Sequence, residues 1–254
     1  LTPLLRQYLE VKENYKDCLI FFRLGDFYEL FFEDAQLAAK CLDITLTKRG
    51  QVDGNDIPMC GVPHHHGDNY IAKLLKNGFK VAICEQIETP EESKKRGQKE
   101  IIKRKVVRIA TPGTLTEEKE LLTSDNNYLM NITFFNDFYN LVVIDISTGE
   151  INLKKCILEK EVLDYISDIM PSEIIVPKDK IYNFISDDKK KVLMITNLEE
   201  LSNYDKAKQT LTDSYATNSN FKISNFSKND IISLGTTIKY VAYTQNGKLP
   251  ALSI

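Results

Sequence analysis

The first 110 residues alternate between short apolar runs and segments with apolar residues at helical spacing. This pattern predicts helices over 3–16, 33–42 and 67–77, and strands over 18–23, 27–31, 44–48, 57–62, 80–87 and 106–109. Thr2 and Pro3 form a helix-start signal, Gly25-Asp26 indicates a turn, and a loop is expected around Gly50 and Gly54. Strands separated by helices predict a mixed sheet with helices packed against it.

A different rhythm follows Pro112-Gly113, where we expect a boundary between domains 1–112 and 113–254. Strands are predicted at 128–135, 139–146, 150–153, 173–176 and 191–195, and helices over 159–169, over 178–185 and after Ser227. Three consecutive strands followed by alternating helices and strands is the order of an RNase H-like domain. The sequence therefore predicts two domains of the α/β class, a mixed-sheet domain and an RNase H-like domain.

Bulk composition adds little beyond a globular class. The 254 residues are 43% hydrophobic and 27% charged, and no apolar run approaches the roughly 18 residues needed to span a bilayer. The start of the chain shows no basic and apolar leader pattern, so we expect a cytoplasmic, nucleoid-associated protein. The five cysteines lie in apolar surroundings, which favours buried reduced thiols over disulfides or zinc ligands: Cys18, Cys41, Cys60, Cys84 and Cys156.

Charge is distributed unevenly. The first 110 residues hold 18 Lys and Arg against 16 Asp and Glu, whereas the remainder holds 15 against 20. A basic run contains one acid, Glu100, among eight cations: Lys94, Lys95, Arg96, Lys99, Lys103, Arg104, Lys105 and Arg108. Such a run is a candidate for phosphate contacts, with a solvated surface loop as the alternative.

Catalytic motifs are sparse. No Gly-x-x-x-x-Gly-Lys-Ser/Thr sequence is present, so the chain is not expected to hydrolyse ATP by itself or to need a cofactor. His64-His65-His66 are adjacent, and adjacent side chains diverge, which disfavours a metal site. Asp145 lies where an RNase H-like nuclease would carry a metal ligand, but two-metal chemistry needs several convergent carboxylates, and an edge or turn role is the alternative.

The informative stretch is Phe22-Arg-Leu-Gly-Asp-Phe-Tyr-Glu-Leu-Phe31. Strand alternation places Phe27 and Glu29 on one face, and burial of that face would bury an unpaired carboxylate. An exposed Phe27 beside an acid suits a surface that inserts between bases, since apolar wedges can unstack a base step from the minor groove. A mispaired step has already lost much of its stacking, so the wedge would enter there most easily. Core packing is the alternative.

Several sequence blocks occur together in a characteristic order. They are Thr2-Pro-Leu-Leu-Arg-Gln-Tyr8, Phe22 to Phe31, Leu42-Asp-Ile-Thr-Leu-Thr-Lys-Arg-Gly50, Ile57-Pro-Met-Cys-Gly-Val-Pro-His64, Val81-Ala-Ile-Cys-Glu-Gln86 and Arg104-Lys-Val-Val-Arg-Ile-Ala-Thr-Pro-Gly-Thr114. In these blocks the chain resembles the amino-terminal domain of the MutS family. The resemblance is strong over 1–114 and weaker over the second domain, and residues 89–103 match no family motif.

The resemblance implies a mismatch-recognition domain followed by a connector domain, and a DNA repair function. The family's Phe-x-Glu motif matches Phe27-Tyr28-Glu29, which implies that Phe27 stacks on a mispaired base and that Glu29 hydrogen-bonds to it. It also implies three partners: duplex DNA with mismatches or small loops, MutL at the connector, and a second copy in the full-length protein. ATP and magnesium belong to the ATPase of longer family members.

Further DNA contacts are expected from Lys48 and Arg49 to the backbone, from Met59 lining the groove, and from Arg108, with a solvated surface charge as the alternative for each cation. An ionised Glu29 can only accept, which suits thymine N3–H, whereas a purine N7 requires the protonated acid. We therefore hypothesise that Glu29 tests whether a base edge is free. Two alternatives remain open, a metal-dependent nuclease using Asp145 and a connector that serves only protein interactions. From this chain alone we expect weak, salt-sensitive DNA binding.

Overall fold

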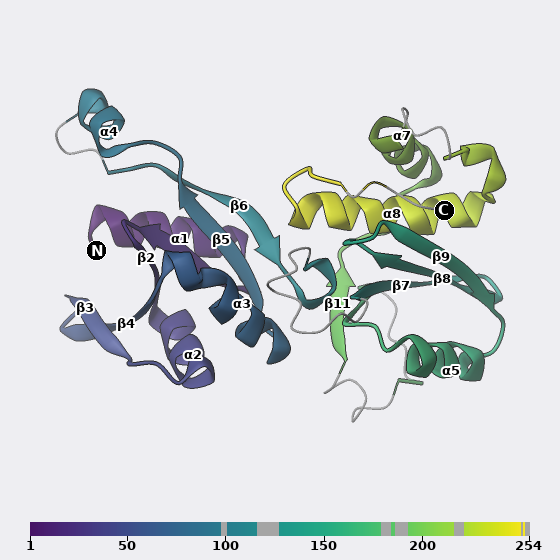
Figure 1. The fold of residues 1–254 in the computed structure, drawn as a ribbon, viewed down its shortest axis with the longest axis horizontal. Coiled ribbons are helices and arrows are strands. Elements are labelled where there is room, and N and C mark those ends of the chain that lie inside the picture. Colours follow the sequence, from purple (N-terminus) through teal and green to yellow (C-terminus); the bar gives the residue numbers. More distant parts are fainter. Residues whose placement is uncertain are drawn as a thin grey trace. The chain divides into compact units, whose positions relative to one another are not determined.

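The computed structural model describes residues 1–97, 101–115, 127–178, 184–185, 193–215, 221–249 and 251. They form two compact units, Leu1–Thr111 and Pro112–Ile254. Each unit contains one mixed sheet with helices packed on both faces (Figure 1), so the predicted α/β class is confirmed.

Unit 1 is built on a six-stranded sheet with the order β3-β4-β2-β1-β5-β6. Only β1 and β5 pair in parallel, and the other neighbours are antiparallel. The elements, in chain order, are α1 (Pro3–Asn14), β1 (Cys18–Leu24), β2 (Phe27–Phe31), α2 (Phe32–Leu42), β3 (Thr47–Val52), β4 (Asn55–Pro63), α3 (Gly67–Lys76), β5 (Lys80–Gln86), α4 (Pro90–Arg96) and β6 (Arg104–Ala110).

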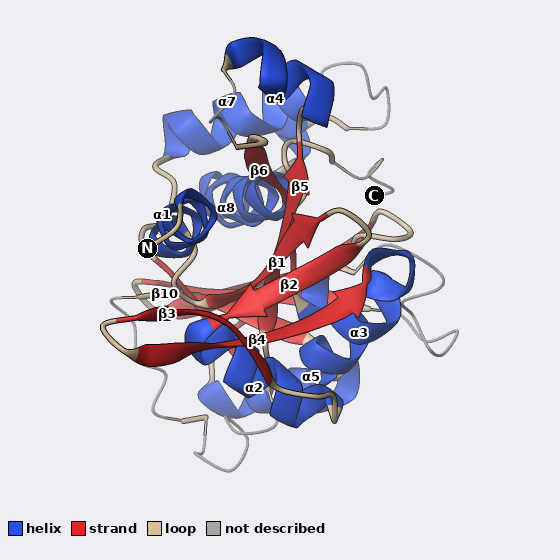
Figure 2. Ribbon diagram, turned by 90° about the vertical axis from the view of Figure 1, so that its left-hand side faces the viewer, coloured by secondary structure: helices blue, strands red, loops and turns tan. Residues whose placement is uncertain are grey.

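Helices cover the two faces of this sheet differently. Helix α1 packs Leu5 and Tyr8 onto the face that carries Ile20, Phe22 and Phe31, while α2 and α3 cover the opposite face (Figure 2). A buried carboxylate joins α1 to the sheet: Asp34 accepts hydrogen bonds from Tyr8 Oη at 2.7 Å and from the Ile20 amide at 3.0 Å. Burial, reinforced by the Asp34 charge, raises the pKa of Tyr8 well above its usual value. Phe27 lies outside the apolar cluster that α1 covers and is exposed.

Most predicted elements of unit 1 are present, but two expectations were wrong. The strand expected at 44–48 runs instead from Thr47 to Val52, and Gly50 lies within it, not in a loop. The pairing register shifts between Lys48 and Gln51, so Gly50 occupies a bulge that its positive φ of 78° allows. The tight turn is Asp53-Gly54, in which both residues have positive φ, as a two-residue hairpin of this kind requires. Helix α4 was not predicted.

Unit 2 has a five-stranded sheet with the order β11-β10-β7-β8-β9, in which only β8 runs antiparallel to the rest. This is the strand order of the predicted RNase H-like fold. Its elements are β7 (Tyr128–Phe135), β8 (Phe138–Asp145), β9 (Glu150–Cys156), α5 (Glu159–Ile169), β10 (Glu173–Pro177), β11 (Met194–Leu198), α7 (Tyr204–Tyr215) and α8 (Lys228–Thr244). The helix expected over 178–185 falls mostly outside the described residues, as does the start of the strand expected at 191–195.

Two apolar layers enclose this second sheet. One layer joins Leu129 and Val142 to α7 and α8, and the other joins Ile132 and Leu141 to α5 (Figure 1). Helix α7, which was not predicted, buries Ala207, Leu211 and Tyr215. None of the helices in the described ranges is long and apolar enough to cross a bilayer.

The predicted burial of the thiols is confirmed for four of the five cysteines, because Cys41 is only half-buried. Burial raises the pKa of Cys18 and Cys84 to about 12 and that of Cys60 to about 11.

Candidate nucleic-acid interface

The candidate site lies where the β1–β2 hairpin turns. Phe27 is the first residue of β2, and it is 47% exposed, which confirms the predicted surface position. Strand alternation places Glu29 and Phe31 on the same face as Phe27, but Phe31 is covered by α1 and is fully buried. Phe27 is thus the exposed end of a row of side chains that continues into the core.

Tyr28 anchors the hairpin from the opposite face. Tyr28 is 8% exposed. Its ring contacts Phe21, with the ring centroids 5.4 Å apart, and its hydroxyl donates to Glu85 on β5. A Cβ atom added to Gly67 would lie 2.8 Å from the Tyr28 ring, so the start of α3 leaves no room behind it. Tight packing of Tyr28 fixes the backbone that presents Phe27.

Glu29 forms an ion pair with Arg49. Arg49 Nη1 donates to Glu29 Oε2 at 2.5 Å, with the acid side chain 15% exposed and the Arg49 side chain 46% exposed. Arg49 lies in the β3 bulge, where the extra residue lets it reach back over β4 to β2. The neighbouring cation points elsewhere: Lys48 Nζ pairs with Asp56 at 2.7 Å.

Strand β4 pairs with β2 and lies beside Phe27 and Glu29. Gly61 pairs with Glu29, and a Cβ atom there would lie 3.6 Å from Glu29 Cγ and 4.0 Å from Phe27 Cδ1. Met59 pairs with Phe31 and packs partly against the core of unit 1. Met59 therefore shares the face of Phe27 and Glu29, as a groove-lining residue would.

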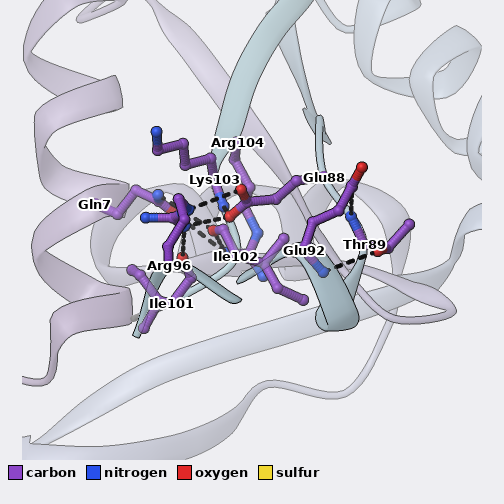
Figure 3. Close-up of polar contacts among 9 residues, drawn as sticks. All are labelled: Gln7, Glu88, Thr89, Glu92, Arg96, Ile101, Ile102, Lys103 and Arg104. Atoms are coloured by element: carbon purple, nitrogen blue, oxygen red, sulfur yellow. Dashed lines mark hydrogen bonds and ion pairs between the residues drawn. The ribbon is translucent and has the colours of Figure 1, made fainter. Parts of the chain in front are cut away.

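A second cation, Arg104, lies on this face. Its guanidinium stacks over the Phe22 ring at 4.9 Å and donates to the carbonyl of Arg23 at 2.6 Å. It also donates to Gln7 Oε1 at 2.9 Å (Figure 3). Burial lowers the pKa of Arg104, and the nearby charge of Glu29 opposes that shift. The sequence placed Arg104 in the basic run and in the last family block, but its contacts with Phe22 and Gln7 could not be predicted because these partners are distant along the chain.

The basic run is divided between the two faces of the sheet. Arg108 lies on the edge strand β6 and pairs with Ile83 on β5. Because Ile83 in turn pairs with Phe21, Arg108 belongs to the face opposite Phe27. Arg108 is therefore separated from Phe27 and Glu29. Its expected DNA contact stays a prediction that would need the duplex to reach this edge.

Helix α4 carries part of the basic run at the outer end of the β5–β6 arm (Figure 1). A capping box starts it: Thr89 and Glu92 each bond the backbone N–H of the other (Figure 3). Glu88 connects the two sides of the arm, because its carboxylate accepts hydrogen bonds from Arg96 and from the Lys103 amide. The hydrogen bond from Arg96 holds the pKa of Glu88 below its usual value. Among the residues of the arm that the structure describes, the exposed cations are Lys94, Lys95, Arg96, Lys103 and Lys105.

The alternative metal-dependent site has no geometric support at Asp145. Its Oδ1 accepts from the Ser147 amide at 2.8 Å and from the Ser147 hydroxyl at 2.6 Å, and its Oδ2 accepts from the Asn127 amide at 3.3 Å. Asp145 therefore stabilises the turn after β8. In the part of the chain that the structure describes, no three His, Cys, Asp or Glu side chains cluster in a way that could hold a metal.

Comparison with known proteins agrees with these domains. Profiles for MutS domain I and MutS domain II match residues 2–119 and 127–253. The chain is 43% identical to the DNA mismatch repair protein MutS of Wolbachia pipientis wMel over 259 aligned residues, and 41% identical to that of Ruegeria pomeroyi over 256. These alignments cover 99% of this chain and 30% and 29% of the two relatives, so the chain spans less than a third of their length.

Proposed function

The chain belongs to the MutS family, and from that premise we propose that it recognises mismatched or unpaired bases in duplex DNA for repair. Phe27 acts as the wedge that enters a weakened base step, and Glu29 makes the hydrogen bond to the displaced base. The observation that carries this proposal is the half-exposed Phe27 ring beside Glu29, with Tyr28 packed beneath it.

Wedge insertion needs an apolar group that is both accessible and rigidly held. Unstacking a base step opposes entry by about a few kcal/mol, and a mispair has already lost part of that stacking. Phe27 meets the first need by its exposure and the second through Tyr28, whose ring fills the space against Gly67. A mobile ring would lose part of the stacking energy to its own ordering.

Glu29 and its cationic neighbours suit a surface that meets both base edges and phosphates. An ionised Glu29 accepts from thymine N3–H, and a protonated one donates to a purine N7, so either form can test an unpaired base edge. We expect Arg49, Lys48 and the exposed lysines of the α4 arm to contact the DNA backbone, which supplies affinity without base specificity.

The role of unit 2 is proposed from family membership. We expect this connector to relay mismatch binding to the ATPase and to MutL in a longer, dimeric family member. Unit 2 carries the acidic part of the chain, which is compatible with a protein-interaction surface.

A titration of this chain against duplexes with and without one G·T pair, at low salt, tests the central proposal. We expect Phe27→Ala to abolish the preference for the G·T duplex while leaving matched-duplex affinity nearly unchanged. Leu37→Ala is the matched control, since Leu37 is 38% exposed on α2, which covers the opposite face. Equal discrimination by Phe27→Ala and the wild type would reject the wedge.

The same duplexes test the hypothesis about Glu29. Glu29→Gln keeps a hydrogen-bond donor for a purine N7 and an acceptor for thymine, so the neutral-acid hypothesis expects its affinity for the G·T duplex to stay close to that of the wild type. If Glu29→Gln instead loses affinity for the G·T duplex as Phe27→Ala does, Glu29 does not act as a neutral donor.

A further inference from the structure

Glu29 lies between two arginines, Arg104 and Arg49, whose side chains are held to different degrees by the rest of the unit. Arg104 is fixed, since its guanidinium stacks on Phe22 and bonds to Gln7 and to the Arg23 carbonyl. Arg49 is held differently: it lies in a bulge of the edge strand β3, and nearly half of its side chain is exposed. Of the two, Arg49 is the cation that can leave Glu29 without disturbing the core.

A DNA phosphate would compete with Glu29 for Arg49. Both groups are oxyanions, and a guanidinium binds either with charge-assisted hydrogen bonds. When Glu29 loses Arg49 it needs another donor, because burial of an acid without a partner is unfavourable. Glu29 is mostly buried, at 15% exposed, so this requirement applies to it.

We infer that Arg49 is a specificity-determining residue that exchanges Glu29 for a DNA phosphate when a mispaired base supplies Glu29 with a new hydrogen-bond partner. This inference rests on the proposed function. At a matched site the bases stay stacked and offer Glu29 no donor, so Arg49 stays on Glu29 and the phosphate contact is not made. The ion pair thereby makes one backbone contact conditional on the base contact.

A double-mutant cycle on the matched duplex isolates this exchange. Glu29→Gln releases Arg49, so it should raise matched-duplex affinity about tenfold at low salt and steepen the slope of log K against log salt by about 0.9, the value for one phosphate. In the Arg49→Gln background the same change should raise affinity about twofold at most and leave the slope unchanged, since only the repulsion between the acid and DNA is relieved.

Lys48 provides the matched control. It precedes Arg49 on β3 and also forms an ion pair, but with Asp56. In a Lys48→Gln background, Glu29→Gln should still raise matched-duplex affinity about tenfold and steepen the salt slope by about 0.9. A smaller effect there would mean that any loss of charge from this hairpin produces the coupling, which would overturn the specific role of Arg49.

The possible outcomes distinguish a failure of the Arg49 exchange from a failure of the proposed mismatch recognition. If the wild type prefers the G·T duplex but Glu29→Gln acts equally with and without Arg49, the exchange alone is rejected. If the wild type binds the two duplexes equally, or binds neither at low salt, the proposed function of this chain fails and the exchange fails with it. Circular dichroism of each variant confirms that the fold is intact.

Discussion

Individual residues of the site show what a sequence can reveal and what it leaves out. The alternation of Phe27 and Glu29 on one strand face predicted exposure, because a buried face would have trapped an unpaired carboxylate. Phe27 is exposed as predicted, but the Glu29 side chain is only 15% exposed and is paired with Arg49. The Arg49 partner of Glu29 and the Tyr28 support beneath Phe27 were missed. Both depend on contacts between strands and helices distant in sequence, such as Tyr28 with Glu85 and Gly67.

Gly67 offers a test of the Tyr28 support. Because a Cβ atom at this position would lie 2.8 Å from the Tyr28 ring, Gly67→Ala should lower the free energy of unfolding by about 1–3 kcal/mol. It should also weaken G·T discrimination by displacing the hairpin. Urea denaturation measures the first effect and the duplex titration the second.

Gly61→Ala is the control for this substitution. A Cβ atom there meets its nearest neighbour at 3.5 Å, an ordinary van der Waals contact, so stability should hardly change. If Gly67→Ala and Gly61→Ala have equal stability, Tyr28 has room to move and its packing does not fix Phe27.

At the scale of elements, apolar periodicity located the central strands and the long helices of both units. Apolar periodicity failed for strands that contain a glycine bulge and for helices with few buried apolar residues. Gly50 suggested a loop but occupies a bulge, and α4 has Ser93 as its buried residue, so no apolar stripe marks it. Helix α7 buries Ala207, Leu211 and Tyr215 at four-residue spacing, a stripe too narrow to stand out among its polar neighbours. The Thr89-x-x-Glu92 capping box was the available signal for α4.

The α4 arm yields a prediction about backbone contacts. Lys94→Gln with Lys95→Gln should weaken binding to matched and G·T duplexes by the same factor and flatten the salt slope by as much as about 2. The reason is that exposed lysines contact phosphates but read no bases. Fluorescence anisotropy titrations at several salt concentrations measure both quantities.

Two exposed lysines of α7 in unit 2, Lys206 and Lys208, provide a charge-matched control for the arm. Their double change to Gln removes the same charge, so a similar flattening would show that net charge, and not the arm, determines the slope.

For the molecule as a whole, family membership and fold class could be inferred from ordered motifs and strand order. Which residues share one face of the sheet could not. The motif blocks place Phe27 and Arg108 in one domain, yet the sheet sets them on opposite faces. Which face meets DNA is decided by pairing register and by the helix that covers each face. Neither is encoded locally.

Buried thiols give a whole-molecule prediction with a defined direction. Unfolded thiols ionise near pH 8.5 on average, whereas Cys18 and Cys84 stay protonated to about pH 12 when folded. Above pH 8.5 the folded chain therefore binds more protons, and the free energy of unfolding should fall as pH rises from about 9 to 11. Urea midpoints at pH 7, 9 and 10 measure this, with Cys84→Ala expected to reduce the decline. A midpoint that rises with pH would contradict it.

The alternation within β2 has one more consequence, for changes in chain length. Gly25 and Asp26 alone connect β1 to β2, and neighbouring strand residues face opposite ways. Deleting or inserting one residue in this connection would turn the Tyr28 hydroxyl toward solvent and the Phe27 ring toward α3, with no side chain replaced. Natural variation at this corner should therefore tolerate no gaps, and position 25 should keep glycine, because Gly25 has a positive φ of 57°.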